Sequence, residues 1–210
     1  MKLAIFGATG MIGSRILDEA LSRGHALTAI TRDPSSFSVS HENLTAVAGN
    51  ALDPASVAEV VKGSDAVLSA IGSTGSSVNV IPEAADSLIK GLSSAGVRRL
   101  VVVGGAGVLE VEPGVQLVDT PKLLEAYRPL ALAHRKAYDL YKASDLDWTF
   151  FSPAAEIEPG ERTGKFKVGA DSLLANEKGE SRISAEDYAI AFVDEVEKPQ
   201  YIHRRVTVAY

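Results

Sequence analysis

Three glycines near the N-terminus have the residue type and the spacing that a phosphate-binding turn requires. Gly7, Gly10 and Gly13 form the pattern G-x-x-G-x-x-G between an apolar run at 2–6 and an apolar helical pattern. A turn between a strand and a helix places a pyrophosphate on the helix N-terminus. We expect Gly7 to permit the turn, Gly10 to admit the phosphates, and Gly13 to let the helix pack on the sheet. A tight turn without a ligand is the alternative. The residues assigned to this turn are Gly7, Thr9, Gly10, Met11, Ile12 and Gly13.

The second predicted strand ends in Thr31-Arg32-Asp33-Pro34. An acidic residue at this point of a dinucleotide-binding fold accepts a hydrogen bond from the ribose 2′-hydroxyl and favours NAD. Here Thr31 takes that position and Arg32 follows, and a guanidinium can bind a 2′-phosphate through two hydrogen bonds. The sequence therefore favours NADPH over NADH, with Arg15 as a second candidate cation. In the alternative, Arg32 is a surface cation paired with Asp33.

Small and polar residues follow the other predicted strands, where a bound dinucleotide would cross the sheet. Asn50 offers an amide for an adenine edge, and Asp53 with Pro54 is typical of a helix start. We place the nicotinamide near the glycines after the fifth strand. The further residues assigned to cofactor binding are Asn50, Ala51, Ala70, Ile71, Gly72, Gly104, Gly105, Ser152, Pro153 and Ala154.

Strands and helices alternate along the chain, which is typical of an α/β protein. The predicted strands are Leu3–Phe6, Ala26–Thr31, Leu44–Ala48, Ala66–Ala70, Leu100–Val103 and Trp148–Phe151. The predicted helices are Met11–Arg23, Ala55–Val61, Val78–Ser94 and Pro129–Ser144. The strands are almost entirely apolar, as expected when helices cover both faces of a parallel sheet. We therefore expect a Rossmann-like, doubly wound parallel sheet.

The chain after residue 151 has a different pattern, and we expect it to form a small subregion on the substrate side. It contains a predicted strand at 163–169, a hairpin whose turn is Asn176–Gly179, a helix capped by Ser184, and a last strand at 201–209. No linker separates this subregion. We therefore predict a single NAD(P)-binding domain over 1–210, with 152–210 contributing the substrate pocket.

The overall composition excludes several classes of function. The 210 residues carry a net charge of −6 with no run of basic residues, which argues against a nucleic-acid partner. There is no cysteine, and the four histidines lack the spacing of metal ligands, so we assign no metal site. No apolar run is long enough to span a membrane, and the first strand begins at once, which leaves no signal peptide. These features favour a cytoplasmic location; they leave a monomer or a dimer open.

These residues together resemble the atypical short-chain dehydrogenase/reductase family, in particular the NADH-flavin reductases and biliverdin reductase B. The resemblance covers nearly the whole chain. It is carried by the glycine turn, Thr31–Pro34, Asp65–Ala70, Asp147-Trp148-Thr149 with Ser152-Pro153, and the stretch from Arg162 to Ala189.

The resemblance also shows what the chain lacks. Orthodox members use a serine and a Y-x-x-x-K pair for proton transfer, and Tyr138 with Lys142 matches that string. In similar proteins, however, the lysine lies about fourteen residues before the tryptophan, which corresponds to His134 here. We therefore interpret Tyr138 as an ordinary helix residue and assign His134 as the catalytic residue. The resemblance implies that it hydrogen-bonds the ribose or a substrate and titrates near neutrality; a surface histidine bonded to a carbonyl is the alternative.

A reductase without a tyrosine acid suits an acceptor that is protonated by solvent. We predict an NAD(P)H-dependent oxidoreductase for a planar small molecule: free FMN or FAD, a quinone or a tetrapyrrole. Leu109, Val111, Val115, Leu117 and Val118 are predicted to form a mobile lid, and Tyr127, Phe151 and Phe166 are candidates for stacking on the acceptor. One alternative is a redox sensor that binds NADP without turnover, like the NmrA-type regulators. A sugar-nucleotide epimerase or dehydratase is another.

Overall fold

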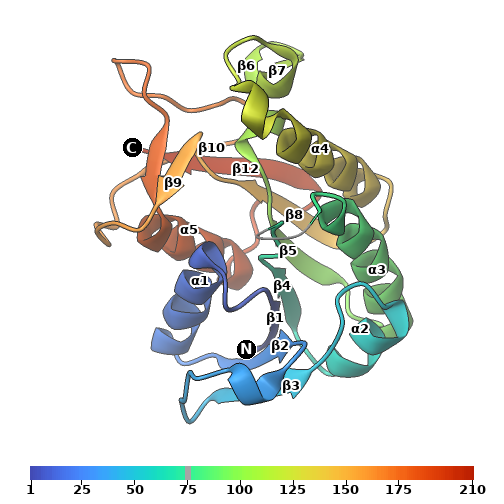
Figure 1. Ribbon diagram of the computed structural model, residues 1–210. Coiled ribbons are helices and arrows are strands. Elements are labelled where there is room, and N and C mark those ends of the chain that lie inside the picture. The colour runs from blue at the N-terminus through green and yellow to red at the C-terminus, as the bar shows by residue number, and fades with distance from the viewer. Residues whose placement is uncertain (74–76) are drawn as a thin grey trace.

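The computed structural model describes residues 1–73 and 77–210. Its centre is an eight-stranded sheet with the strand order β10-β12-β8-β5-β4-β1-β2-β3 (Figure 1). These strands are β1 (Lys2–Phe6), β2 (Ala26–Thr31), β3 (Leu44–Ala48), β4 (Ala66–Ser69), β5 (Arg99–Val103), β8 (Asp147–Ser152), β10 (Lys167–Gly169) and β12 (Arg204–Ala209). All neighbours pair in parallel except the edge strand β10, which is antiparallel to β12. The predicted Rossmann-like architecture is confirmed, and the strand order reverses between β1 and β4.

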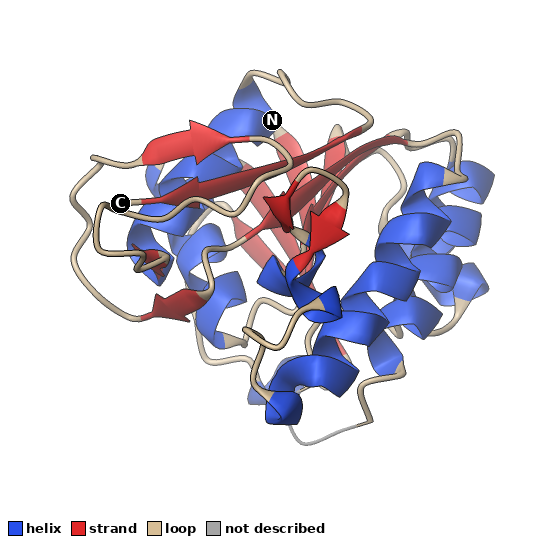
Figure 2. Ribbon diagram, turned by 90° about the horizontal axis from the view of Figure 1, so that it is seen from above, coloured by secondary structure: helices blue, strands red, loops and turns tan. Residues whose placement is uncertain are grey.

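In the described parts of the chain, five α-helices cover the two faces of the sheet (Figure 2). The helices α1 (Met11–Ser22) and α5 (Ala185–Glu197) lie on one face, and α2 (Pro54–Val60), α3 (Val80–Ala95) and α4 (Arg128–Lys142) lie on the other. Leu3 and Ile5 of β1 join the core under α1 and α5, whereas Ala4 and Phe6 join the other core. This alternation shows why each strand is apolar at consecutive positions.

Local sequence signals set the ends of the helices. The carboxylate of Asp53 accepts a hydrogen bond from the Ala55 N–H at 3.0 Å and caps α2. The hydroxyl of Ser184 accepts from the Asp187 N–H at 3.0 Å and caps α5, as predicted. Gly24 follows α1 at φ +81°, a conformation that favours glycine. Within the described residues, no helix is long and apolar enough to cross a membrane.

The hairpin predicted before α5 is wrong, because the strand after its turn pairs with a different strand. The turn forms, because the Gly179 N–H donates to the Asn176 carbonyl, but β11 (Arg182–Ser184) pairs in parallel with β9 (Glu156–Glu158). This pairing joins segments that lie far apart in the sequence, so a local turn signal does not reveal it. The strand predicted at 163–169 is also shorter, since only β10 pairs with the sheet.

The segment after β5 forms several short elements and buries part of its apolar side chains. It contains the short 3₁₀ helices η2 (Ala106–Val108), η3 (Leu117–Asp119) and η4 (Glu125–Tyr127), with a small ribbon of β6 (Glu110–Glu112) and β7 (Val115–Gln116). Leu109, Leu117 and Val118 are buried, whereas Val115 is exposed. These three buried side chains pack into the protein, and the mobile lid stays a prediction.

Candidate cofactor and acceptor site

A cleft of about 1940 Å³ lies over the carboxyl ends of the central strands. It begins at the glycine turn after β1, passes the ends of β2, β3 and β4, and continues over the ends of β5 and β8. The predicted cofactor-binding residues that line it are Gly7, Thr9, Gly10, Met11, Ile12, Gly13, Arg32, Asn50, Ala51, Ala70, Ile71, Gly72, Gly104, Gly105, Pro153 and Ala154. The fold therefore brings together segments that are spread over most of the chain.

Ser152 is the one predicted cofactor residue that does not line the cleft. It is fully buried, and its hydroxyl has no hydrogen-bond partner among the described residues. Ser152 follows Phe150 by two positions in β8, so its side chain points to the same covered face, under α2–α4. Side chains alternate along a strand, so Ser152 points away from the cleft although it is adjacent to Pro153, which lines it.

The three glycines of the turn have different roles: Gly7 and Gly13 are needed for packing, whereas Gly10 leaves space for a ligand. Gly7 has φ +80°, and a β-carbon on Gly13 would lie 2.0 Å from the Gly7 carbonyl oxygen, so both glycines are required for packing. A β-carbon on Gly10 would meet only that oxygen, at 3.4 Å. Gly10 is also the N-cap of α1, and neither a side-chain cap nor an acidic residue occupies this helix N-terminus. The free N–H groups and the space at Gly10 fit a pyrophosphate.

Arg32 lies at the cleft with its side chain exposed. Among the described residues it forms no ion pair with Asp33, whose carboxylate instead accepts from the Ser35 N–H at 3.0 Å and the Ser35 hydroxyl at 2.6 Å. The side chain of Arg15 is held elsewhere, because its Nε donates to Glu186 at 3.0 Å. Arg32 is therefore the better placed of the two candidate cations.

Near the ends of β2 and β3 the cleft is lined by Asn50 and by residues that the sequence did not single out, among them Phe37. The amide oxygen of Asn50 accepts from the Leu52 N–H at 3.0 Å, which leaves the amide nitrogen to donate to a ligand. Phe37 lines the cleft and also packs against the core under α1. It comes from the loop after η1 (Pro34–Ser36), where no glycine or strand-end pattern marks it.

His134 lines the other end of the cleft from within α4. It is 9% exposed, its Nδ1 has no partner among the described residues, and its ring packs edge-on against Phe150. Burial lowers the pKa of His134 to about 4. The expectation of titration near neutrality is wrong, because desolvation disfavours the imidazolium. His134 is a neutral hydrogen-bonding group at physiological pH.

Tyr138 does not line the cleft, although it completes the Y-x-x-x-K string. Its ring packs against Trp148 and Phe150 at centroid distances of 5.9 and 5.0 Å. Lys142 lies over the same ring at 5.0 Å and pairs with Asp139. Burial raises the pKa of the Tyr138 hydroxyl. The pair belongs to the packing of α4 on the sheet.

The walls near His134 are mainly apolar. Of the three aromatic candidates for stacking, Tyr127 lines the cleft and is 56% exposed, whereas Phe151 is in the core and Phe166 packs against that core. The large apolar residues at this end are Val111, Leu117, Leu123, Leu124, Tyr127, Leu130, Ile157 and Leu173. Such a surface suits a flat, apolar molecule.

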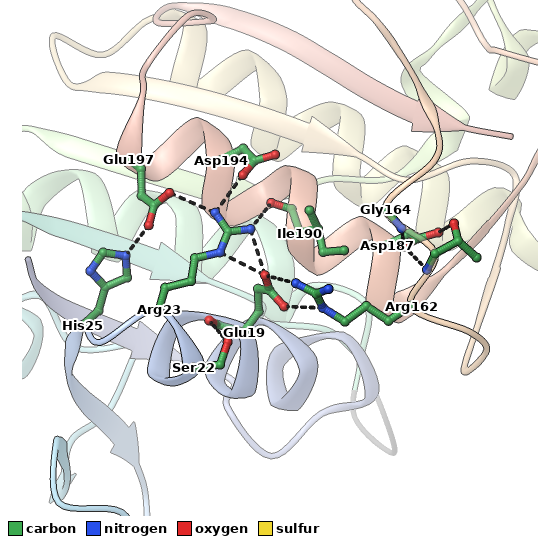
Figure 3. Close-up of polar contacts among 11 residues, drawn as sticks. Glu19, Ser22, Arg23, His25, Arg162, Gly164, Asp187, Ile190, Asp194 and Glu197 are labelled. Atoms are coloured by element: carbon green, nitrogen blue, oxygen red, sulfur yellow. Dashed lines mark hydrogen bonds and ion pairs between the residues drawn. The ribbon is translucent and has the colours of Figure 1, made fainter.

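Ionic contacts hold the chain after β9 against α1 and α5 (Figure 3). Arg162 donates to the two carboxylate oxygens of Glu19 at 3.0 and 2.9 Å, and Arg23 donates to the same carboxylate. Burial alone would raise the pKa of Glu19, but the hydrogen bonds from Arg162 and Arg23 hold it below its usual value. Thr163 and Gly164 donate backbone N–H groups to Asp187. The wall of the cleft that contains β9 is therefore tied to the helix that begins at the glycine turn.

Comparison with known proteins identifies the family to which this chain belongs. Residues 7–199 match the model of the NAD(P)H-binding family. The chain belongs to this family. The uncharacterized protein YwnB of Bacillus subtilis is 40% identical over 99% of this chain and 98% of its own length. The predicted family resemblance is thus confirmed.

Solved structures of similar proteins carry several provisional names. A Burkholderia pseudomallei protein provisionally named as exported is 53% identical, with full coverage of both chains and a TM-score of 0.93. A Bacteroides thetaiotaomicron protein provisionally named an epimerase is 37% identical, with 100% and 96% coverage and a TM-score of 0.91. A Streptococcus pneumoniae protein provisionally named an NADH-flavin reductase is 34% identical, with 100% and 99% coverage and a TM-score of 0.86.

Proposed function

We propose that this NAD(P)H-binding protein is an NADPH-dependent reductase of planar small molecules such as flavins or quinones. The observation that carries the proposal is the continuity of one cleft, which joins the glycine turn and Arg32 to an apolar end beside His134. The provisional name of the Streptococcus pneumoniae protein agrees with it. We further propose that the chain forms one domain and works in the cytoplasm.

The proposed roles of the residues follow from their positions. The N–H groups at the start of α1 bind the pyrophosphate, and Arg32 binds the 2′-phosphate of the adenosine ribose. Gly104, Gly105, Pro153 and Ala154 bracket the nicotinamide, and Tyr127 covers the acceptor. When bound, NADPH supplies a hydride to the acceptor; solvent supplies the proton that completes the two-electron reduction.

His134 contributes a hydrogen bond from a neutral ring in this proposal. Its Nδ1 is buried and has no hydrogen-bond partner among the described residues, and its pKa of about 4 keeps the imidazole uncharged through the neutral range. A neutral imidazole can orient the ribose or an acceptor carbonyl without adding charge to an apolar site. Orientation in the cleft then supplies most of the acceleration, since the Tyr138–Lys142 pair lies outside the cleft.

The two alternatives make different demands on the cleft. An epimerase or dehydratase of the orthodox kind needs a tyrosine acid at the nicotinamide, and Tyr138 lies outside the cleft. A redox sensor needs only the cofactor, which the cleft would also bind. Steady-state NADPH oxidation with FMN, riboflavin and a neutral quinone separates the reductase from the sensor. Saturable oxidation supports the reductase; tight NADPH binding without oxidation by any acceptor supports the sensor.

A further inference from the structure

A buried arginine lies behind the acceptor end of the cleft. Arg205 is in β12, and only 3% of its side chain is exposed. Its neighbour Val206 joins the core under α1 and α5, so Arg205 points to the other face of the sheet. There its guanidinium lies 5.3 Å from the centre of the Tyr138 ring of α4. Among the described residues that line the cleft, none comes from β12, so any effect of Arg205 on a ligand is indirect.

All three nitrogens of this guanidinium donate to nearby acceptors. The Nη1 atom donates to the Val108 carbonyl oxygen, and Nη2 donates to the Glu110 carboxylate at 3.2 Å. The Nε and Nη2 atoms donate to the Asp171 carboxylate at 3.1 and 2.8 Å. Val108 and Glu110 belong to the segment after β5, whereas Asp171 belongs to the segment after β10. Arg205 thus ties two segments that are far apart in the sequence to one strand of the sheet.

The two segments also bond directly to each other. The Glu110 N–H donates to the Asp171 carbonyl at 2.8 Å, and the Leu173 N–H donates to the Glu110 carbonyl at 2.8 Å. These bonds form an isolated parallel bridge between Glu110 and Ser172. Two backbone hydrogen bonds contribute only about 1 kcal/mol each, so such a bridge needs further support. The charged hydrogen bonds of Arg205 supply that support from the buried side.

Residues next to this bridge line the acceptor end of the cleft. Gly107 and Val111 flank the contacts of the first segment, and Leu173 and Ala175 follow those of the second. Where these walls lie relative to the nicotinamide therefore depends on the bridge and on Arg205 behind it. The residues assigned to the pyrophosphate and to the adenosine ribose lie on other segments of the chain.

We infer that Arg205 is a positioning residue for the acceptor: it fixes the two walls at 107–111 and 171–175, between which and the nicotinamide a planar molecule is held. The inference rests on the proposed function and adds a residue to it. Without the arginine the walls should move apart more readily, and an acceptor would lose contacts and orientation. NADPH should bind as before, because its phosphates are held at the other end of the cleft.

Two substitutions of Arg205 remove different parts of the clamp. Arg205→Met keeps a long side chain but removes the charge and every donor. Arg205→Lys keeps the charge but lacks the planar fork that reaches three acceptors at once. We expect the dissociation constant of FMN for the NADP⁺-loaded protein, measured by flavin fluorescence, to rise about 10-fold in Arg205→Met and about 3-fold in Arg205→Lys.

The kinetic constants distinguish positioning from a purely structural role. The KM for FMN and for a neutral quinone should rise with the dissociation constant, while the dissociation constant of NADPH should stay within about twofold. A purely structural role would reduce the folded fraction of the protein. It would therefore lower kcat per total protein and leave KM and the dissociation constants of the folded protein unchanged.

Arg99 provides the matched control, because it is a second buried arginine that pairs with a carboxylate. Its side chain is 10% exposed and donates to Glu195 at 2.8 Å and to the Thr149 hydroxyl at 2.8 Å. It begins β5 and so lies at the edge of the sheet opposite to the cleft. Arg99→Met should lower the melting temperature, as Arg205→Met does, without changing the dissociation constant or the KM of FMN.

Asp171→Asn provides the test if Arg205→Met does not fold. The Asp171 side chain is 59% exposed and does not line the cleft, so this substitution weakens one contact of the clamp with little loss of stability. We expect the dissociation constant of FMN to rise about 3-fold. Asp86→Asn is its control, because Asp86 is a half-exposed partner of Lys90 on α3, outside the cleft.

The outcomes separate this inference from the proposed function. The clamp is refuted by unchanged FMN binding and KM in Arg205→Met or, if that variant does not fold, in Asp171→Asn. An equal loss of NADPH binding, or an equal loss of FMN binding in Arg99→Met, also refutes it. Wild-type turnover with KM unchanged in these variants leaves the reductase standing. Weaker FMN binding in the variants, with no NADPH oxidation by any of the proteins, supports the clamp and refutes the reductase.

Discussion

The backbone of Gly105 lies directly against the imidazole of His134: a β-carbon at position 105 would be 2.8 Å from both Cγ and Cδ2 of the ring. Gly105 follows β5 at the cleft, and His134 comes from α4 on the neighbouring layer. The absence of a side chain at position 105 is therefore what lets the buried ring reach the cleft wall.

Replacing His134 should weaken catalysis more than folding at neutral pH. We expect His134→Ala to lower kcat/KM by about 3- to 10-fold, the loss expected for one neutral hydrogen bond. His134→Gln keeps an amide that can donate a hydrogen bond and should retain more activity. Steady-state NADPH oxidation measures both, with thermal unfolding as the control for folding. Unchanged activity in both variants would remove His134 from the site.

Acid should destabilise the protein through the same residue. The pKa of His134 is lowered by burial from 6.5 to about 4, so between these values the unfolded chain binds more protons than the folded one. The free energy of unfolding should fall as the pH drops from about 6.5 toward about 4, by about 3 kcal/mol in total. Urea unfolding of the wild type and His134→Gln at several pH values checks this. Identical pH dependence in both proteins would contradict the assignment.

The glycine turn allows a separation of binding from folding. Gly10→Val should abolish NADPH binding with little change in melting temperature, because the added side chain would occupy ligand space and its β-carbon would meet only the Gly7 carbonyl oxygen, at 3.4 Å. Gly13→Ala is the contrasting variant. Its β-carbon would lie 2.0 Å from that carbonyl oxygen, so the melting temperature should fall. Isothermal titration and thermal unfolding report the two effects; unimpaired NADPH binding by Gly10→Val would place the dinucleotide site elsewhere.

Arg32→Ala should change the cofactor preference. We expect a loss of about 1–3 kcal/mol in NADPH binding, the range for a hydrogen bond to a charged group, and almost no change for NADH. Arg15→Ala is the control, since the Arg15 side chain is held by Glu186. Titration of each variant with both cofactors gives the comparison. Equal losses for NADPH and NADH in Arg32→Ala would show that Arg32 does not read the phosphate.

The sequence predicts the parts of the fold that depend on local patterns. Continuous apolar strands, the glycine turn after β1, and the caps at Asp53 and Ser184 are all visible within a few residues. They establish the parallel sheet and the cleft at its carboxyl edge. Once the strands are assigned, residues at the strand ends, such as Arg32, can be predicted to lie at the cleft.

Long-range packing explains what the sequence did not predict. The pairing of β9 with β11 joins segments separated by a long excursion, and no local signal marks it. Leu109 and Val118 are fully buried although no local pattern marks them as core residues, and the inward orientation of Ser152 depends on the register of β8. The lowered pKa of His134 arises from neighbours on other elements, so the sequence alone suggested an ordinary titration.

If this NAD(P)H-binding protein reduces planar acceptors without a tyrosine acid, Tyr138 is dispensable for turnover, and one measurement tests this directly. Steady-state NADPH oxidation with a neutral quinone is compared for the wild type and Tyr138→Phe, which keeps the ring that packs on Phe150. We expect saturable turnover in both, with rates that agree within about twofold. Loss of about 10²-fold or more in Tyr138→Phe, the range for removal of a general acid, or no turnover by the wild type, would contradict the account.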